Sequence, residues 1–274
     1  MAEDIIYEVR DRTVVITLNI PDKLNSLNGE QYMKLARAVE DADNEEGTVV
    51  TIIQSTGRFF SAGANFSDKG ISQAKTEDLF SHDYWLNKFV ARNTYITNVF
   101  HNHKKVLVAA VNGPVIGLSA ALVALCDLIY VKDDTQFYIL CPFSNLGLVC
   151  EGATSATLFM RLGWSKASEA LLFARPIQGP ELTRLGFVNK AYNDYKFAST
   201  EEFNAQIYKD VVAQFENLHE ASIFLNKELL KVNREPAIHA ANSKEVVMGL
   251  YKWVEGVPQS RFVQLAQKDI KHKM

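Results

Sequence analysis

The residue best suited to proton chemistry is a single carboxylate in an apolar segment. Glu151 lies in the run PFSNLGLVCEG, residues 142–152. Burial among apolar neighbours raises the pKa of a carboxyl group, which leaves it basic enough to move protons near neutral pH. An acid at this place also suits the first turn of a following helix, so Glu151 alone fits both a catalytic base and a helix cap.

Two turns rich in small residues could hold a negatively charged oxygen. The segment RFFSAGANF, residues 58–66, leaves the backbone amide of Ala64 uncovered by large side chains. In residues 106–126, an apolar strand leads through a glycine-containing turn into a helix whose first N–H groups, such as that of Leu118, have no partner inside it. Such donors suit an anion at the positive end of the helix dipole, although ligand-free turns of this kind also occur.

The elements that must position these groups follow from hydrophobic patterning. A β/α half is followed by a mostly helical half, without repeats or low-complexity segments. Asn28 with Gln31 predicts a capping box at the start of the first helix. The predicted strands are 5–9, 14–19, 48–54, a strand beginning at 106, 128–131, 136–140 and 187–190. The predicted helices are 28–41, 84–103, 118–124, 154–162, 166–173, 180–185, 201–218, 221–232 and 236–254.

Composition excludes several classes of function. The chain has 274 residues, 47% of them hydrophobic, and a net charge of −3, so we expect no nucleic acid and no membrane as partners. The basic residues between 268 and 273 are interpreted as a solvated helix end. Residues 106–129 form the most apolar stretch, but polar residues and a proline interrupt it. The three cysteines lack metal-ligand spacing, which predicts reduced thiols and no metal site.

Two long motifs resemble one known family. FFSAGANF, residues 59–66, resembles the FxAGAD loop of the crotonase, or enoyl-CoA hydratase/isomerase, superfamily. VNGPVIGLSAALVALCDLIY, residues 111–130, resembles its NGxxxGxGxxLxxxCD helix entry. The resemblance implies an α/β fold, with a crotonase-type spiral of repeated ββα units over residues 1–195 and a helical trimerisation region over 196–274. It also implies a homotrimer or homohexamer.

The reaction depends on which of the family's acids are present. Hydratases of the family carry two glutamates, and their positions hold Ala121 and Phe143 here. Glu151 stands where yeast-type peroxisomal Δ3,Δ2-enoyl-CoA isomerases have one glutamate, in a segment similar to their NLGLxxEGG. The segment ARNTY, residues 91–95, also resembles those enzymes. The resemblance therefore implies an isomerase that moves a double bond from C3 to C2 of fatty acyl-CoA thioesters in the β-oxidation of unsaturated fatty acids.

The implied mechanism needs only one acid. Glu151 takes a proton from C2 and returns it to C4, while the amides of Ala64 and Leu118 hold the dienolate oxygen. The family also implies coenzyme A contacts at Lys23, Leu24 and the carbonyl of Ala62. Asn93 is a further candidate for lining the cavity, with an amide on the helix surface as the alternative. No cofactor is expected, because coenzyme A is part of the substrate.

The sequence departs from the family at a few positions. Asn65 replaces the aspartate of the first motif, and Ala153 replaces the second glycine after the catalytic position. The C-terminal residues His272, Lys273 and Met274 form a loose variant of the SKL address, which predicts a peroxisomal location. Histidine is larger than the residue usual at the first position of that signal.

Two other functions remain open at this stage. A Δ3,5-Δ2,4-dienoyl-CoA isomerase would use additional acids, and the nearby candidates are Asp127, Asp133 and Asp134, which follow the buried helix. A catalytically silent subunit, kept as a partner or as a module that binds coenzyme A or RNA, is the other alternative. The acidic balance of the chain opposes RNA binding, and turnover by the isolated protein separates the two classes.

Overall fold

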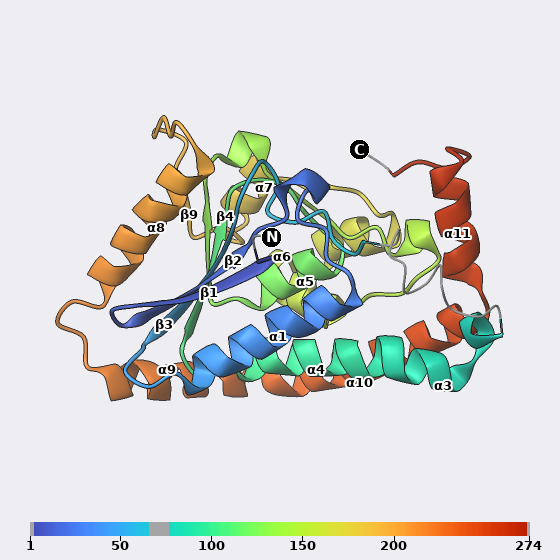
Figure 1. Cartoon of the computed structure of the whole chain (residues 1–274), viewed down its shortest axis with the longest axis horizontal. Helices are drawn as coiled ribbons and strands as arrows, with labels where there is room; N and C mark the ends of the chain where they lie inside the picture. The colour runs from blue at the N-terminus through green and yellow to red at the C-terminus, as the bar shows by residue number, and fades with distance from the viewer. Residues whose placement is uncertain (1–2, 66–76, 273–274) are drawn as a thin grey trace.

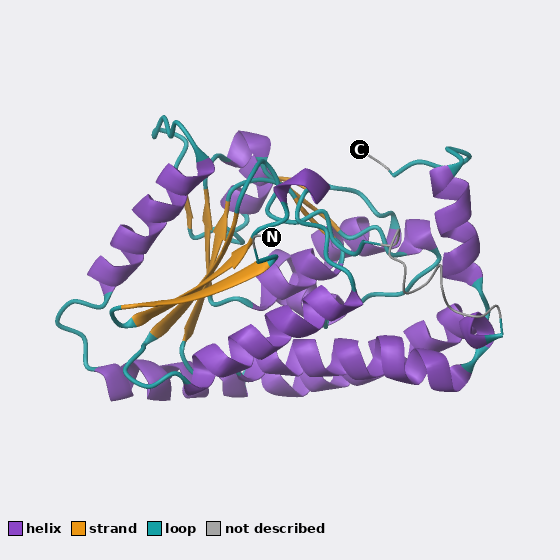
Figure 2. Ribbon diagram, viewed as in Figure 1, coloured by secondary structure: helices purple, strands orange, loops and turns teal. Residues whose placement is uncertain are grey.

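The computed structural model describes residues 3–65 and 77–272, and in these ranges the strands form two sheets. The larger sheet has the order β1-β2-β3-β4-β6-β9, and the smaller has the order β5-β7-β8. Figures 1 and 2 show the larger sheet flanked by helices. The strands are β1 Ile5–Arg10, β2 Thr13–Leu18, β3 Val50–Ser55, β4 Val106–Val111, β5 Val115–Ile116, β6 Leu128–Val131, β7 Tyr138–Leu140, β8 Ile177–Gln178 and β9 Lys190–Ala191.

The central strands of the larger sheet are covered on both faces. β1 and β2 pair antiparallel, and every later pair in this sheet is parallel. Every residue of β2 and β3 is buried, as in parallel strands that are packed on both sides. Ile53 belongs to the main core with the helices α1 (Gly29–Asn44) and α5 (Leu118–Leu125), whereas Ile52 packs in a second cluster with α8 (Thr200–Gln214). Period-two alternation therefore distributes the strand residues between two cores.

Long helices form a layer along one side of the molecule (Figure 1). α4 contacts both α1 and α10, so segments far apart in the sequence lie side by side. The predicted capping box of α1 is confirmed, since Asn28 and Gln31 exchange hydrogen bonds of 2.8 Å. The remaining helices are α3 His82–Trp85, α4 Ala91–Asn102, α6 Thr154–Leu172, α7 Gly179–Arg184, α9 Glu220–Val232, α10 Glu235–Val254 and α11 Val257–Ala266. None of the helices described is long and apolar enough to cross a membrane.

Several elements differ from the sequence prediction. The helix predicted over 84–103 is divided into α3, a π-helical turn η3 (Leu86–Val90) and α4. Two predicted helices are joined in α6, with a kink at Gly163 where φ is 75° and ψ is 167°. The predictions missed α11, which begins after Gly256 and has a proline in its first turn. They also missed β8, which is too short to show a periodic pattern.

Candidate active site

The two glycine-containing turns lie side by side because short parallel pairings join them. Ser61 pairs with Val115 in a parallel bridge, and the Ile116 N–H donates to the Ser61 carbonyl at 3.0 Å. Ala64 follows Gly63 in the first turn, and Leu118, the first residue of α5, follows Gly117 in the second. Both residues therefore come directly after the point where Gly63 meets Ile116 and Gly117.

Glycine at position 63 allows this close approach. A Cβ there would lie 2.8 Å from the Ile116 carbonyl oxygen, and φ is +84°, in the region that favours glycine. Among the residues that the structure describes, neither the Ala64 N–H nor the Leu118 N–H has a hydrogen-bond acceptor. Two backbone donors from separate turns thus remain free next to each other, as an oxyanion site requires.

Glu151 is brought to the same place by the turn that follows it. Gly152 has a φ of +66°, and a Cβ there would lie 2.6 Å from Ala121 Cβ and 3.1 Å from Leu118 Cδ1. The turn therefore packs directly on the first turns of α5. Glu151, Ala64 and Leu118 consequently line the same cavities.

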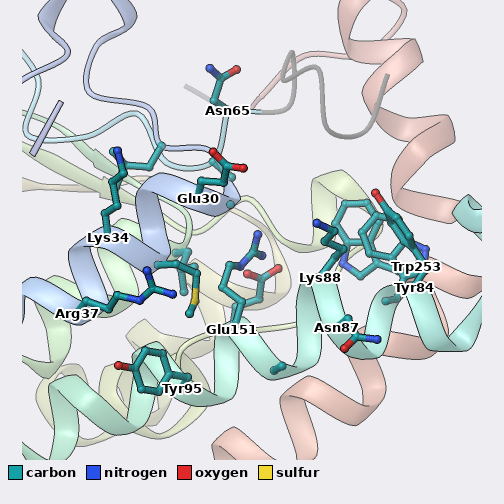
Figure 3. Close-up of a pocket in the computed structure, with 18 residues that line it drawn as sticks. Glu30, Lys34, Arg37, Asn65, Tyr84, Asn87, Lys88, Tyr95, Glu151 and Trp253 are labelled. Carbon is teal, nitrogen blue, oxygen red and sulfur yellow. The ribbon is translucent and has the colours of Figure 1, made fainter. Parts of the chain in front are cut away.

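Two cavities meet at these three residues. The larger one, about 750 Å³, lies between α1 and the α3–η3–α4 segment, and Figure 3 shows Glu151 at its centre with Trp253 and Lys88 on one side and Lys34 and Arg37 on the other. The smaller cavity, about 190 Å³, has mostly apolar walls. Its lining residues include Ala62, Phe143, Leu146, Leu148, Phe262 and Leu265. A ligand whose reacting carbon sits at the junction could extend in both directions.

The surroundings of Glu151 set its basicity. Its side chain is 8% exposed, and burial is the largest cause that raises its pKa from 4.5 to about 7. The charge of Arg92 and a hydrogen bond of 2.9 Å from Asn93 Nδ2 to Glu151 Oε2 oppose that rise. Arg92 Nε donates in turn to Asn93 Oδ1 at 3.0 Å. Glu151 is therefore a carboxylate that can both accept and release a proton near neutral pH.

Together these groups can support proton transfer next to a carbonyl. A base with a pKa near neutrality removes a proton from carbon, and two preorganised N–H donors stabilise the oxyanion that forms. The buried position strengthens both interactions because little water competes with them.

The structure places the predicted coenzyme A contacts outside the larger cavity. Lys23 is exposed at the end of a short 3-10 turn, and Leu24 follows it with a φ of 53°. The Ala62 N–H donates to the Leu24 carbonyl at 2.9 Å, so this loop lies against the first glycine turn. Of the three residues, only Ala62 lines a described cavity, the smaller one. Their role in binding coenzyme A stays a prediction.

Asn93 does not lie where the sequence analysis expected. It is fully buried rather than on the helix surface, and it lines neither described cavity. Its amide instead holds the Glu151 carboxylate. We also missed Arg92, since a charged residue in a helical pattern suggests a solvated face. The signal that could have found it is its position next to Asn93 on a helix that packs against the core.

The acids considered for a dienoyl-CoA isomerase have structural partners. Asp127 pairs with Lys227 at 2.6 Å, Asp134 accepts from the Thr183 hydroxyl at 2.8 Å, and Asp133 caps a short 3-10 turn. None of the three aspartates lines a cavity that the structure describes. Sequence reasoning did not find the two acids that do lie nearby.

Two acids of the described residues lie near Glu151, and they come from opposite ends of the chain. Glu30, at the start of α1, lines the larger cavity. Glu245, on α10, is 5% exposed and binds the turn that follows Glu151. Neither belongs to a motif, so only the folded structure brings them to the site.

Known proteins resemble the chain over almost its whole length. Residues 8–261 match the model of the enoyl-CoA hydratase/isomerase family. A Saccharomyces cerevisiae protein named 3,2-trans-enoyl-CoA isomerase is 42% identical over 276 residues, which cover 99% of this chain and 97% of the relative. A Pyricularia oryzae protein named Delta(3,5)-Delta(2,4)-dienoyl-CoA isomerase is 38% identical over 281 residues, which cover 97% and 98% of the two chains.

A solved structure shares the fold. The enoyl-CoA hydratase/isomerase from Pseudoalteromonas atlantica has a TM-score of 0.81 at 22% identity, with 99% of this chain and 100% of that chain covered. This likeness confirms the predicted fold class.

Proposed function

Because the chain belongs to the enoyl-CoA hydratase/isomerase family, we propose that it is an isomerase that moves the double bond of a 3-enoyl-CoA thioester to C2. The observation that carries this proposal is the buried carboxylate of Glu151, which has a raised pKa and lines the same cavities as two free backbone donors. Unsaturated fatty acyl-CoA in β-oxidation is the proposed substrate class.

The reaction is a proton transfer within the substrate. Glu151 removes a proton from C2, the negative charge moves onto the thioester oxygen, and the same carboxyl returns the proton to C4. The amides of Ala64 and Leu118 hold that oxygen, and each such donor is typically worth about 2.7–4 kcal/mol in the transition state. General base catalysis adds roughly 10²- to 10⁴-fold. No metal ion and no cofactor is part of this mechanism.

Hydration is disfavoured by the residues at the family's other acid positions. Phe143 lines the smaller cavity, and Ala121 is fully buried under the Glu151 turn. Neither side chain can activate water. Addition of water to a 2-enoyl thioester would need a second acid or base at such a position.

The dienoyl-CoA isomerase reading stays the alternative, and one observation favours it. Glu30 lines the larger cavity with Glu151, so a second carboxylate faces the same space. If this reading were right, turnover of a 3,5-dienoyl thioester would exceed that of a 3-enoyl thioester, and Glu30→Gln would abolish it.

The proposed function also includes an assembly and a location. Exposed apolar side chains on α9 and α10 support a homotrimer or a homohexamer of this chain. The peroxisomal location rests on the C-terminal residues, of which Lys273 and Met274 lie outside the described part of the chain. Microscopy of a fluorescent fusion, with and without the last three residues, tests the location.

Turnover of 3-hexenoyl-CoA to 2-hexenoyl-CoA tests the proposed reaction. We expect the wild-type protein to catalyse it without added metal or cofactor, and Glu151→Gln to lose at least about 10²-fold in kcat. Glu216→Gln makes the same chemical change at an exposed position of the α8–α9 connection and serves as the control. Near-normal turnover by Glu151→Gln would refute the assignment of the base.

A further inference from the structure

The helix that follows the base is capped by a residue from the other end of the chain. Both carboxylate oxygens of Glu245 accept hydrogen bonds at the start of α6. The Ala153 N–H donates to Oε2 at 2.7 Å, while the Ser155 N–H and Oγ donate to Oε1 at 3.0 and 2.6 Å. The N-cap residue Ala153 has no side chain for this task. Glu245 therefore supplies the cap that the local sequence lacks.

This cap acts on a turn in which two successive residues have a positive φ. Gly152 has a φ of +66° and Ala153 a φ of +59°, a conformation that costs a residue with a Cβ about 1–2 kcal/mol. Inside the turn, the Thr154 N–H and hydroxyl donate to the Glu151 carbonyl at 3.2 and 2.8 Å. Outside support is therefore needed to keep the strained turn, and with it Glu151, in one conformation.

A second contact on the same side of α10 fixes the distance between this helix and the base segment. Gly249 lies four residues after Glu245, so both residues face the same side of the helix. A Cβ at Gly249 would lie 2.6 Å from the Phe89 ring and 3.7 Å from Val149 Cγ2. Two contacts one helical turn apart hold α10 against the segment that carries Glu151.

We propose that Glu245 is a positioning residue for the reaction: its carboxylate holds the turn that presents Glu151 to the junction of the two cavities. The proposal rests on the proposed function. It makes α10, in the C-terminal helical region, a part of the active centre, although Glu245 lines neither of the two cavities.

The charge of Glu245 also gives its role a measurable signature. In the described part of the chain, the titratable groups that interact electrostatically with Glu151 are Arg92 from α4, Tyr32 from α1, the neighbouring Cys150, and Glu245 from α10, while Glu30 lines the larger cavity with it. Burial raises the pKa of Tyr32, and it raises the pKa of Cys150 to about 12, so both are neutral at pH 7. Burial is the main cause that raises the pKa of Glu151, the positive charge of Arg92 lowers it, and the negative charge of Glu245, whose own pKa burial raises, adds a smaller rise. Removal of the Glu245 charge therefore moves the pKa of Glu151 down.

Glu245→Gln tests the proposal because it keeps the size of the side chain. The amide offers one acceptor oxygen where the carboxylate offers two, so one N–H of the turn loses its partner. We expect kcat on 3-hexenoyl-CoA to fall about 10- to 100-fold with little change in KM, as for a small misplacement of a reacting group. The acidic limb of the pH profile should move to lower pH. Glu255→Gln, at the exposed C-cap of the same helix, is the matched control and should change neither.

Ser155→Ala separates the hydrogen bonds from the charge. It removes one donor to Glu245 and leaves the carboxylate in place, so kcat should fall less and the acidic limb should stay where it is in the wild type. The melting temperature of each variant shows whether it is folded at the assay temperature. A fall in melting temperature with unchanged kcat and pH profile in Glu245→Gln would make Glu245 merely structural and overturn the proposal.

The pKa of Glu151 can also be measured without turnover. The infrared spectrum contains a band of the protonated carboxyl group, which is recorded at several pH values. Subtracting the spectrum of Glu151→Gln from that of the wild type leaves the band of Glu151 alone. We expect it to titrate at lower pH in the Glu245→Gln background. An inactive wild-type protein would refute the proposed function. The titration would still test whether Glu245 changes the pKa of Glu151.

Discussion

The chemistry of the site is set by what surrounds one carboxylate. Burial raises the pKa of Glu151, because a buried carboxylate loses its hydration. The charge of Arg92 and the hydrogen bond from Asn93 stabilise the ionised carboxylate and lower its pKa. The resulting pKa of about 7 lies near neutral pH. A base of this kind can accept a proton from carbon and release it again.

The pH dependence of kcat/KM should follow this carboxylate. The base must be ionised, so the rate should rise with pH and level off above about 7. Arg92→Met removes a positive charge that lowers the pKa of Glu151, so the acidic limb should move to higher pH. Profiles of the two proteins on 3-hexenoyl-CoA measure this shift. An unmoved limb would mean that Arg92 does not act on the base.

The raised pKa also predicts an effect on stability. A carboxyl group whose folded pKa lies above its unfolded value stabilises the fold at low pH, and this contribution is lost as the pH rises from about 4.5 through about 7. At pH 8 the ionised Glu151 costs the fold roughly 3 kcal/mol. Glu151→Gln should therefore melt at a higher temperature than the wild type at pH 8, with a smaller difference at pH 5. Equal differences at both pH values would contradict the raised pKa.

For single residues, the sequence predicts roles that depend on neighbours in the chain, but not contacts with residues far away in the sequence. Glu151 and the capping box at Asn28 can be predicted because each depends on neighbours within a few residues. Asn93 and Arg92 cannot be placed, since their roles depend on which face of α4 meets a segment 58 residues away. Glu245 is farther still in sequence, 92 residues from the amide of Ala153 that it binds.

The two glycine-containing turns and helix α5 contribute main-chain N–H groups, rather than side chains, to the active site. The oxyanion site depends on two turns that the parallel bridge between Ser61 and Val115 joins, so that Ala64 and Leu118 line the same cavities. Helix α5 adds its free first N–H and the positive end of its dipole. The sequence motifs predict both turns correctly, because glycines mark them. That the turns pair side by side follows from the larger sheet and not from either motif.

Gly63→Ala should separate the two turns. Its Cβ would lie 2.8 Å from the Ile116 carbonyl oxygen, so the first turn must move away from the second. We expect kcat to fall by about 10²-fold or more, the usual cost of a displaced oxyanion donor. Gly47→Ala carries the same kind of strain, with a φ of +73°, but meets no atom within 4 Å. That control should lose stability and keep its kcat, and an equal loss of kcat in both variants would refute the account.

The β/α half and the helical half of the chain meet at the active site. The β/α half supplies the donors and the base, and the helical half packs α10 against the segment that carries the base. The sequence analysis assigned residues 196–274 to assembly only. The part of this region that acts on the site was not predictable, because a helical pattern does not reveal what each face contacts.

The exposed apolar side chains of α9 predict association between copies of this chain. Leu225, Leu229 and Leu230 are each at least 65% exposed, which a lone molecule rarely tolerates in one cluster. Leu229→Glu should shift the protein toward smaller species in size-exclusion chromatography with light scattering. Asn226→Glu, on an exposed position of the same helix, is the control. A wild-type protein that is monomeric at micromolar concentration would contradict the proposed assembly.

A crystal structure with a bound, unreactive 3-enoyl-CoA analogue tests the central claim most directly. The account predicts that the thioester oxygen lies about 2.7–3.1 Å from the nitrogens of both Ala64 and Leu118. It also predicts that one carboxylate oxygen of Glu151 lies within about 3–3.5 Å of C2 and can reach C4 on the same face. A thioester bound away from these nitrogens, or a Glu151 side chain turned away from the acyl carbons, would contradict it.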